Sequence, residues 1–149
     1  MSLLQKIDTD YIEAYKAKAT VKVAVLRHLK TAIQTRMAEG RGKDVTDDDV
    51  LDLIAKQVKQ RKDSFEQYTS AGRDDLARVE AEELAELEQY LPRPLGDEAL
   101  AAAIDKAVAD LGATGVQDMG KVMQAVLSAH KGQVDGKKAS ALVRSRLSA

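Results

Sequence analysis

One stretch of the sequence comes close to a phosphate-binding loop. Residues 115–122 read GVQDMGKV, with two glycines and a lysine at the spacing of a P-loop. Val122 stands where a Ser or Thr hydroxyl must hold magnesium, and the stretch follows a helical pattern that ends at Leu111 instead of a β-strand. We therefore do not expect nucleotide hydrolysis. A helix N-terminus that carries Lys121 can still attract a phosphate, in competition with Asp118 as the helix cap.

The remaining titratable residues form no recognisable catalytic or metal-binding set. Several glutamates lie within residues 80–86, but helical di-iron sites need Glu-x-x-His pairs, and neither His28 nor His130 has such a partner. The absence of cysteine excludes disulfides, zinc ribbons and thiol nucleophiles. We expect no metal, no cofactor and no catalytic activity of the chain's own. A hydrolase that uses Ser64 or a histidine remains a third alternative.

Charged residues are segregated along the chain, although the net charge is only −1. Residues 16–43 carry eight basic residues and one acid, and residues 74–88 carry seven acids and one base. We interpret these two runs as solvated helix faces that pair with one another across the helical bundle. From Lys121 onward six basic residues accompany only Asp135, and we see no comparably concentrated acidic run in that part of the chain. The six, which form either a solvated face or a polyanion-binding surface, are Lys121, Lys131, Lys137, Lys138, Arg144 and Arg146.

The aromatic residues limit the kind of nucleic acid that this basic stretch would bind. Proteins that read single strands stack the bases on aromatic side chains. The one Phe and the four Tyr all lie before residue 91, outside the basic stretch. Any RNA bound there would be held through its backbone and its folded shape, and the binding would depend strongly on salt.

The composition predicts an all-α protein. Ala supplies 23 of the 66 apolar residues, only two prolines interrupt the chain, and the alternating patterns typical of strands are scarce. No run approaches the about 20 apolar residues that span a bilayer. Lys6 and Asp8 interrupt the apolar start, so we expect no signal peptide. These features predict a soluble, cytoplasmic protein without a membrane anchor.

Seven helices are predicted from apolar residues at three- to four-residue spacing. Thr46 and Asp49 predict a capping box at the start of the third helix, and Gly72 predicts its end. The helix that follows should bury Leu76, Val79, Leu84, Leu87 and Leu91. The seven expected segments are residues 3–18, 20–39, 46–72, 74–90, 100–111, 119–127 and 139–147, with a flexible basic loop at 40–43.

A domain boundary is predicted at residues 91–96. Pro92 and Pro94 stand at alternate positions, which cannot continue a helix and which bias their neighbours toward extended geometry. We therefore expect a four-helix N-terminal domain at residues 1–91, a hinge at 92–96 and a C-terminal three-helix domain at 97–149.

Several strings along nearly the whole chain resemble one family. They resemble the YqeY-like family, whose members are relatives of the C-terminal part of GatB, the B subunit of the tRNA-dependent amidotransferase. Two small departures are Gly96, where a Ser or Thr cap is commoner, and the linker residues Arg93 and Pro94. The matching strings are Leu26-Arg27, residues 59–64, residues 71–76, residues 82–88 with Tyr90-Leu91-Pro92, residues 118–123, and Gly132 with Asp135-Gly136-Lys137.

The resemblance implies two helical domains and a role near tRNA. In GatB the related region contacts the tRNA body, and the amidotransferase chemistry lies in other domains. A family label that cites a carbon–nitrogen ligase with glutamine as amido-N-donor would therefore describe the relative's complex. We expect a non-catalytic tRNA- or RNA-binding accessory module linked to tRNA-dependent amidation. The alternative is a protein–protein adaptor that docks an amidotransferase or a synthetase through residues 74–88 and the long helix before them.

Overall fold

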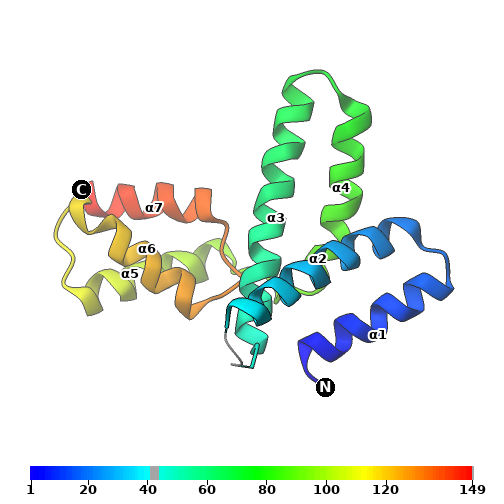
Figure 1. The fold of residues 1–149 in the computed structure, drawn as a ribbon. Coiled ribbons are helices and arrows are strands. Elements are labelled where there is room, and N and C mark those ends of the chain that lie inside the picture. Colours follow the sequence, from blue (N-terminus) through cyan, green and yellow to red (C-terminus); the bar gives the residue numbers. More distant parts are fainter. Residues whose placement is uncertain (41–43, 149) are drawn as a thin grey trace. The chain divides into compact units, whose positions relative to one another are not determined.

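The computed structural model describes residues 1–40 and 44–148 of the 149-residue chain. Within this part the protein consists of helices joined by short connections and contains no β-strand, which confirms the predicted all-α class (Figure 1). Most of the loop predicted at residues 40–43 lies outside the described residues. The elements are α1 (Leu3–Lys16), α2 (Thr20–Glu39), α3 (Asp47–Ser70), α4 (Asp74–Glu88), α5 (Asp97–Leu111), the 3₁₀ turn η1 (Val116–Asp118), α6 (Met119–Ala129) and α7 (Gly136–Ser148).

The helices form two compact units, one of residues 1–91 and one from residue 92 onward. The first unit contains α1 to α4, and the second contains α5 to α7. Gln133 binds the start of the second unit, because its carbonyl accepts the Leu95 N–H at 2.9 Å and its side-chain amide donates to the Arg93 carbonyl at 2.9 Å. The hinge expected at residues 92–96 stays a prediction. In the described ranges no helix has the length and apolar character needed to cross a membrane.

The two ends of α3 follow from local sequence signals. At its start the Thr46 hydroxyl accepts the Asp49 N–H at 3.2 Å, and the Asp49 carboxylate accepts the Thr46 N–H at 3.0 Å. This reciprocal pair confirms the predicted capping box. After the helix, Gly72 adopts a φ of +73°, and the Arg73 N–H donates to the Tyr68 carbonyl at 2.8 Å. The left-handed glycine reverses the chain, so α4 can run back along α3.

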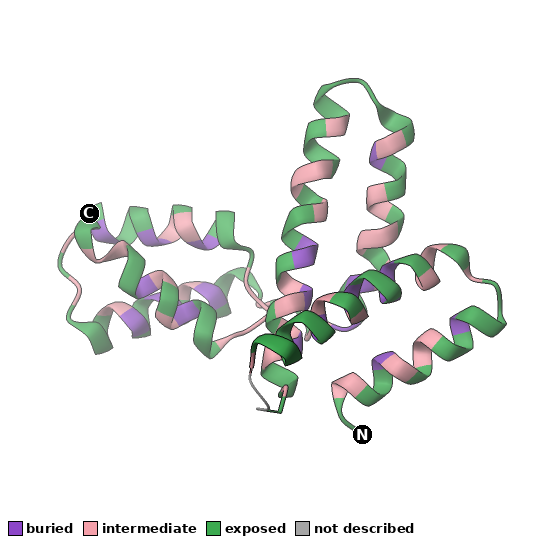
Figure 2. Cartoon of the chain, viewed as in Figure 1, coloured by how far each residue is buried: buried purple, intermediate pink, exposed green. Residues whose placement is uncertain are grey.

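The core of the first unit is built from one stripe of aliphatic side chains on each helix. Ile7, Leu29, Ile54 and Leu87 are fully buried and come from α1, α2, α3 and α4 in turn (Figure 2). The first half of α3 and the last turns of α4 supply these contacts, whereas the distant part of the α3–α4 hairpin projects beyond α1 and α2 (Figure 1). Within the described residues of the first unit, this projecting part consists of α3 and α4, which pack against each other.

The projecting hairpin explains why one predicted core residue is wrong. Val79 is 46% exposed, and Ala77 is buried in its place, at 5% exposed. Within the described part of the first unit, α3 is the helix that covers α4 at this level, so a single narrow face of α4 is buried (Figure 1). Residues two positions apart lie on opposite sides of a helix. Leu87 is buried as predicted, whereas Leu76, Leu84 and Leu91 are only partly buried.

The second unit has its own core. Ile104 on α5, Val122 on α6 and Val143 on α7 are fully buried and pack in one cluster (Figure 2). Two residues of the apolar patterns predicted for these helices are not buried, because Leu111 is 47% and Leu127 is 41% exposed. Leu111 is the last residue of α5, and Leu127 lies in the last turn of α6, next to Val126, which is buried.

A strained residue joins α1 to α2. Lys18 has a φ of +57°, a left-handed conformation that is costly for a residue with a Cβ. We expect Lys18→Gly to raise the free energy of unfolding by about 0.5–1 kcal/mol, because glycine adopts this conformation without the clash. Lys16→Gly, in the last turn of α1, should instead lower it by a similar amount. Urea unfolding followed by circular dichroism measures both, and equal destabilisation by the two glycines would contradict the prediction.

Tyr90 ties the chain after α4 to α1. Its hydroxyl donates to the Asp10 carboxylate at 2.6 Å, and the Lys6 ammonium binds the same oxygen at 3.1 Å while lying 5.0 Å from the centre of the Tyr90 ring. Burial alone would raise the pKa of Asp10, but the hydrogen bonds from Tyr90 and Lys6 outweigh it and hold this pKa below its usual value. Burial, and then the contact with Asp10, raise the pKa of Tyr90 far above its usual range.

We expect Tyr90→Phe to lower the free energy of unfolding at neutral pH by about 1–3 kcal/mol, because it leaves a mostly buried carboxylate with one donor fewer. The pH dependence should change at both ends. The raised pKa of Tyr90 gives stability that is present below about pH 10 and lost as the pH rises toward the folded-state value. The lowered pKa of Asp10 gives stability that is present above about pH 4 and lost on acidification. Denaturant unfolding measured at several pH values should show a loss of stability at alkaline pH in the native chain only. The same alkaline loss of stability in Tyr90→Phe would contradict this prediction.

Candidate functional site

The basic residues of the second unit lie on α6, on α7 and between them. Lys121 is in the first turn of α6, and Lys131 lies two residues after its last residue, Ala129. Asp135 sets the start of α7, because its carboxylate accepts the N–H groups of Lys137 at 3.0 Å and Lys138 at 3.2 Å. This N-cap fixes the first turn of α7 and thereby places both lysines on the protein surface.

The packing of α7 divides its basic residues into two flanks. Ala139, Val143 and Leu147 recur every four residues and are buried, so they mark the side of α7 that packs into the core. Lys137 and Arg144 are seven residues apart and therefore lie on one face of the helix, which we call the first flank. The second flank consists of Lys138 and Arg146, on the other side of the buried stripe. All four residues are exposed.

The second flank pairs with carboxylates of α5. The Lys138 ammonium binds Asp97, and the Arg146 Nε lies 2.6 Å from Asp105. The bond to Asp97 raises the pKa of Lys138. We expected no comparably concentrated acidic run in this unit; α5 nevertheless supplies single acids to individual basic residues. Both pairs are solvent-exposed, and such pairs contribute little stability, so a phosphate can displace the carboxylates at small cost.

Asp118 occupies the N-cap position of α6, as predicted, but its side chain makes no capping hydrogen bond to this helix. Its carboxylate accepts the N–H groups of Thr114 at 3.0 Å and Gly115 at 3.4 Å, in the loop before η1. The Thr114 hydrogen bond is the main cause that lowers the pKa of Asp118, while partial desolvation opposes it. Because η1 leads directly into α6, the stretch that resembles a P-loop is a tight turn and the first helical turn after it. As expected from the sequence, it follows a helix and not a strand.

The units also differ in total charge. The first unit has fifteen basic and eighteen acidic residues, and the second has eight basic and six acidic residues. Within the second unit four of the six acids lie on α5, whereas all six predicted contact residues follow the start of α6. Positive charge is thus concentrated on the α6–α7 side.

Among the described residues, both charged runs of the first unit form ion pairs with neighbouring helices, but they do not pair with one another as the sequence interpretation expected. Lys30 of the basic run lies 3.0 Å from Asp8, and Arg36 lies 3.4 Å from Asp49. The acidic run pairs with α3, where Arg61 binds both Glu80 and Glu83. We therefore look to the second unit for a polyanion-binding surface.

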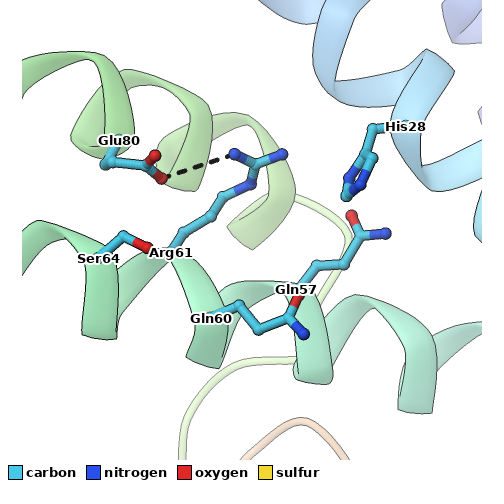
Figure 3. A pocket seen from close by; sticks show the side chains of 6 residues that line it. All are labelled: His28, Gln57, Gln60, Arg61, Ser64 and Glu80. Atoms are coloured by element: carbon cyan, nitrogen blue, oxygen red, sulfur yellow. Dashed lines mark ion pairs between the residues drawn. The ribbon is translucent and has the colours of Figure 1, made fainter. Parts of the chain in front are cut away.

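A small hollow of about 130 Å³ lies among α2, α3 and α4 (Figure 3). The sequence does not predict this hollow, although Ser64 and a histidine are the residues of the hydrolase alternative. His28 and Gln57 point toward one another across it, and no hydrogen bond joins His28 to Ser64 in the described part of the chain. Its lining residues are His28, Gln57, Gln60, Arg61, Ser64 and Glu80. Among the described residues, no group of three or more His, Asp or Glu side chains could hold a metal ion.

The signal for this hollow is weak but present in the sequence. Gln57 interrupts the apolar stripe of α3 beside Val58, and it is 6% exposed. Arg61 follows it one turn later, so the two polar side chains share a helix face. A polar residue at a core position is the only mark that could have been read without the structure.

Comparison with known families decides the assignment. The model of the Yqey-like protein family matches residues 4–147, nearly the whole chain. The chain belongs to the YqeY-like family. This confirms the resemblance drawn from the sequence strings, and the family match spans both units of the YqeY-like chain.

The similar curated proteins are yeast proteins named "Altered inheritance of mitochondria protein 41, mitochondrial". The one from Lachancea thermotolerans is 32% identical over 103 residues, which cover 68% of this chain and 54% of that protein. Those from Kluyveromyces lactis and Saccharomyces cerevisiae are 31% and 29% identical, and cover 54% and 55% of this chain and 44% of each relative. The YqeY-like chain thus spans about half the length of these relatives. The names of these relatives refer to mitochondria, and the cytoplasmic localisation of this chain stays a prediction.

Proposed function

We propose that this YqeY-like chain is a non-catalytic module that binds folded RNA, tRNA above all, through the phosphates. The observation that carries the proposal is the charge of α6 and α7, where six basic residues accompany a single acid. The six residues are those predicted from the sequence: Lys121, Lys131, Lys137, Lys138, Arg144 and Arg146. Phosphate contacts supply most of the affinity of such interfaces and depend steeply on salt.

The arrangement on α7 suits a phosphate backbone better than it suits bases. Lys137 and Arg144 are two helical turns apart, about 10 Å along the axis, which lets them reach phosphates on separate nucleotides. No Phe, Tyr or Trp follows residue 90, so the second unit has no such aromatic side chain on which a base could stack. A rigid, folded RNA is therefore the expected partner, recognised by the position of its phosphates.

The link to tRNA-dependent amidation belongs to the same proposal and rests on the resemblance to the C-terminal part of GatB. In this view the chain contributes binding, and the chemistry is done elsewhere. Cytoplasmic localisation is also part of the proposal, and imaging of a tagged chain would test it.

A second candidate, a protein–protein adaptor, is favoured by the projecting α3–α4 hairpin. Phe65 and Val79 are 39% and 46% exposed there. Exposed apolar side chains beside acidic residues are common where a partner docks. An amidotransferase or a synthetase with a basic surface would be such a partner.

Purification of the tagged chain from cells, with and without nuclease, separates the two candidates. The RNA-binding proposal predicts that RNA copurifies at low salt, is enriched in tRNA, and is lost at high salt or after nuclease treatment. The adaptor proposal predicts a protein partner that survives nuclease. Recovery of a protein partner alone, with no RNA at low salt, would contradict the first proposal.

A further inference from the structure

Two polar atoms in the hollow of the first unit are buried without a partner. They are Oε1 of Gln57 and Nε of Arg61, which have no hydrogen-bond partner in the described part of the chain. Both residues line the hollow, and they stand one turn apart on α3 (Figure 3). Buried polar groups in native proteins are nearly always hydrogen-bonded, so an unpartnered pair at the wall of a cavity points to something that binds there.

The two atoms differ in what they require. Gln57 Oε1 accepts a hydrogen bond, and Arg61 Nε donates one. A ligand must therefore present one donor and one acceptor toward the same wall. A second nitrogen of the Arg61 guanidinium, Nη1, is already engaged, because it binds Glu83 and lies 3.6 Å from Glu80. Two carboxylates around one guanidinium leave an excess of negative charge, which disfavours phosphate and carboxylate ligands.

The volume of the hollow and the geometry of the two hydrogen bonds further limit the chemical class of the ligand. A hollow of about 130 Å³ holds a group equivalent to about four water molecules. A primary carboxamide is neutral, planar and of this size, and one N–H lies on the same edge as its C=O. A trans secondary amide, such as the peptide group, has its N–H and C=O on opposite edges and can satisfy only one of the two atoms.

We propose that this hollow binds a primary carboxamide, which donates to Gln57 Oε1 and accepts from Arg61 Nε. The carboxamide belongs either to a free small molecule or to an Asn or Gln side chain of a bound peptide. His28 closes the hollow from α2 opposite Gln57 (Figure 3). The site lies in the first unit, so it does not rest on the proposed RNA binding of α6 and α7.

The Arg61 Nε–H signal in a ¹H–¹⁵N spectrum of the intact, labelled chain reports binding directly. Titration with acetamide should move this signal in a saturable way, with a dissociation constant on the order of 10 mM for so small a ligand. N-methylacetamide and acetate should bind at least about tenfold more weakly, since each loses one of the two hydrogen bonds or adds a negative charge. Free L-glutamine and N-acetyl-L-glutamine methylamide then distinguish a free ligand from a peptide side chain.

Gln57→Met keeps the length of the side chain and removes the acceptor, so it should abolish the acetamide-dependent shift. Gln67→Met, at an exposed position of α3 outside the lining of the hollow, is the matched control and should preserve it. Circular dichroism checks that both variants fold, and the native titration tests the site without any variant. No saturable shift with acetamide would mean that water alone occupies the hollow. An equal response to acetate would also overturn the proposal. A response to cytidine, whose amino group and ring nitrogen also present one donor and one acceptor, with none to acetamide, would overturn it as well.

Discussion

Replacing Lys137 and Lys138 together by glutamate should weaken the binding of a folded tRNA by at least about tenfold at moderate salt. The double variant removes two positive charges from the first turn of α7 and puts two negative charges beside the phosphates. The slope of log K against log salt should become shallower by about 1 for each phosphate contact that is lost. The variant should fold, because acidic residues in the first turn of a helix favour its dipole.

Lys59→Glu with Lys62→Glu is the matched control. Both lysines are exposed on α3 in the first unit, so this variant changes the net charge equally. Fluorescence anisotropy with labelled tRNA should show near-native affinity for the control and a loss for the α7 pair. If the two double variants weaken binding equally, net charge and not the α6–α7 surface accounts for the affinity.

Ile104→Ala should unfold the second unit and leave the first unit intact. Ile104 is fully buried in the core shared by α5, α6 and α7, and replacing such a residue by alanine costs about 2–5 kcal/mol. A three-helix unit that begins at residue 92 is small, and domains of about 60 residues bury only about 60% of the surface of their unfolded chain and are marginally stable. The loss should therefore exceed what this unit can tolerate. RNA binding should disappear with it.

Ile33→Ala is the counterpart in the first unit, where Ile33 is 1% exposed. It should destabilise the first unit by a similar amount and leave tRNA affinity close to native. Differential scanning calorimetry and limited proteolysis would show which unit has unfolded in each variant. Loss of both units together in Ile104→Ala would show that they do not fold independently.

Features encoded by neighbouring residues could be predicted from the sequence. The capping box of Thr46 and Asp49 and the left-handed Gly72 define the ends of α3 within a few residues, so they need no knowledge of the fold. Val79 and Asp118 are two residues whose environment could not be predicted from their sequence neighbours. Whether Val79 is buried depends on which helices pack against the distant part of α4. The carboxylate of Asp118 accepts hydrogen bonds from N–H groups of the preceding loop instead of those of α6.

Some features of the candidate site could likewise be predicted from the sequence, and others could not. The basic residues of α6 and α7 are evident in the sequence as a run with one acid. Their pairing with α5 could not be predicted, because it depends on which side of α7 packs against the core and which carboxylates face that side. The hollow around Gln57 and Arg61 was missed for the same reason, since α2, α3 and α4 must be assembled before its walls exist.

The salt dependence of tRNA binding by the intact chain tests the central claim most directly. Equilibrium binding of a folded tRNA would be measured from about 50 mM to about 200 mM KCl. If four to six of the basic residues of α6 and α7 contact phosphates, log K should fall with log salt with a slope between about −3 and −5. Absence of binding at the lowest salt, or an affinity that does not change with salt, would contradict the account.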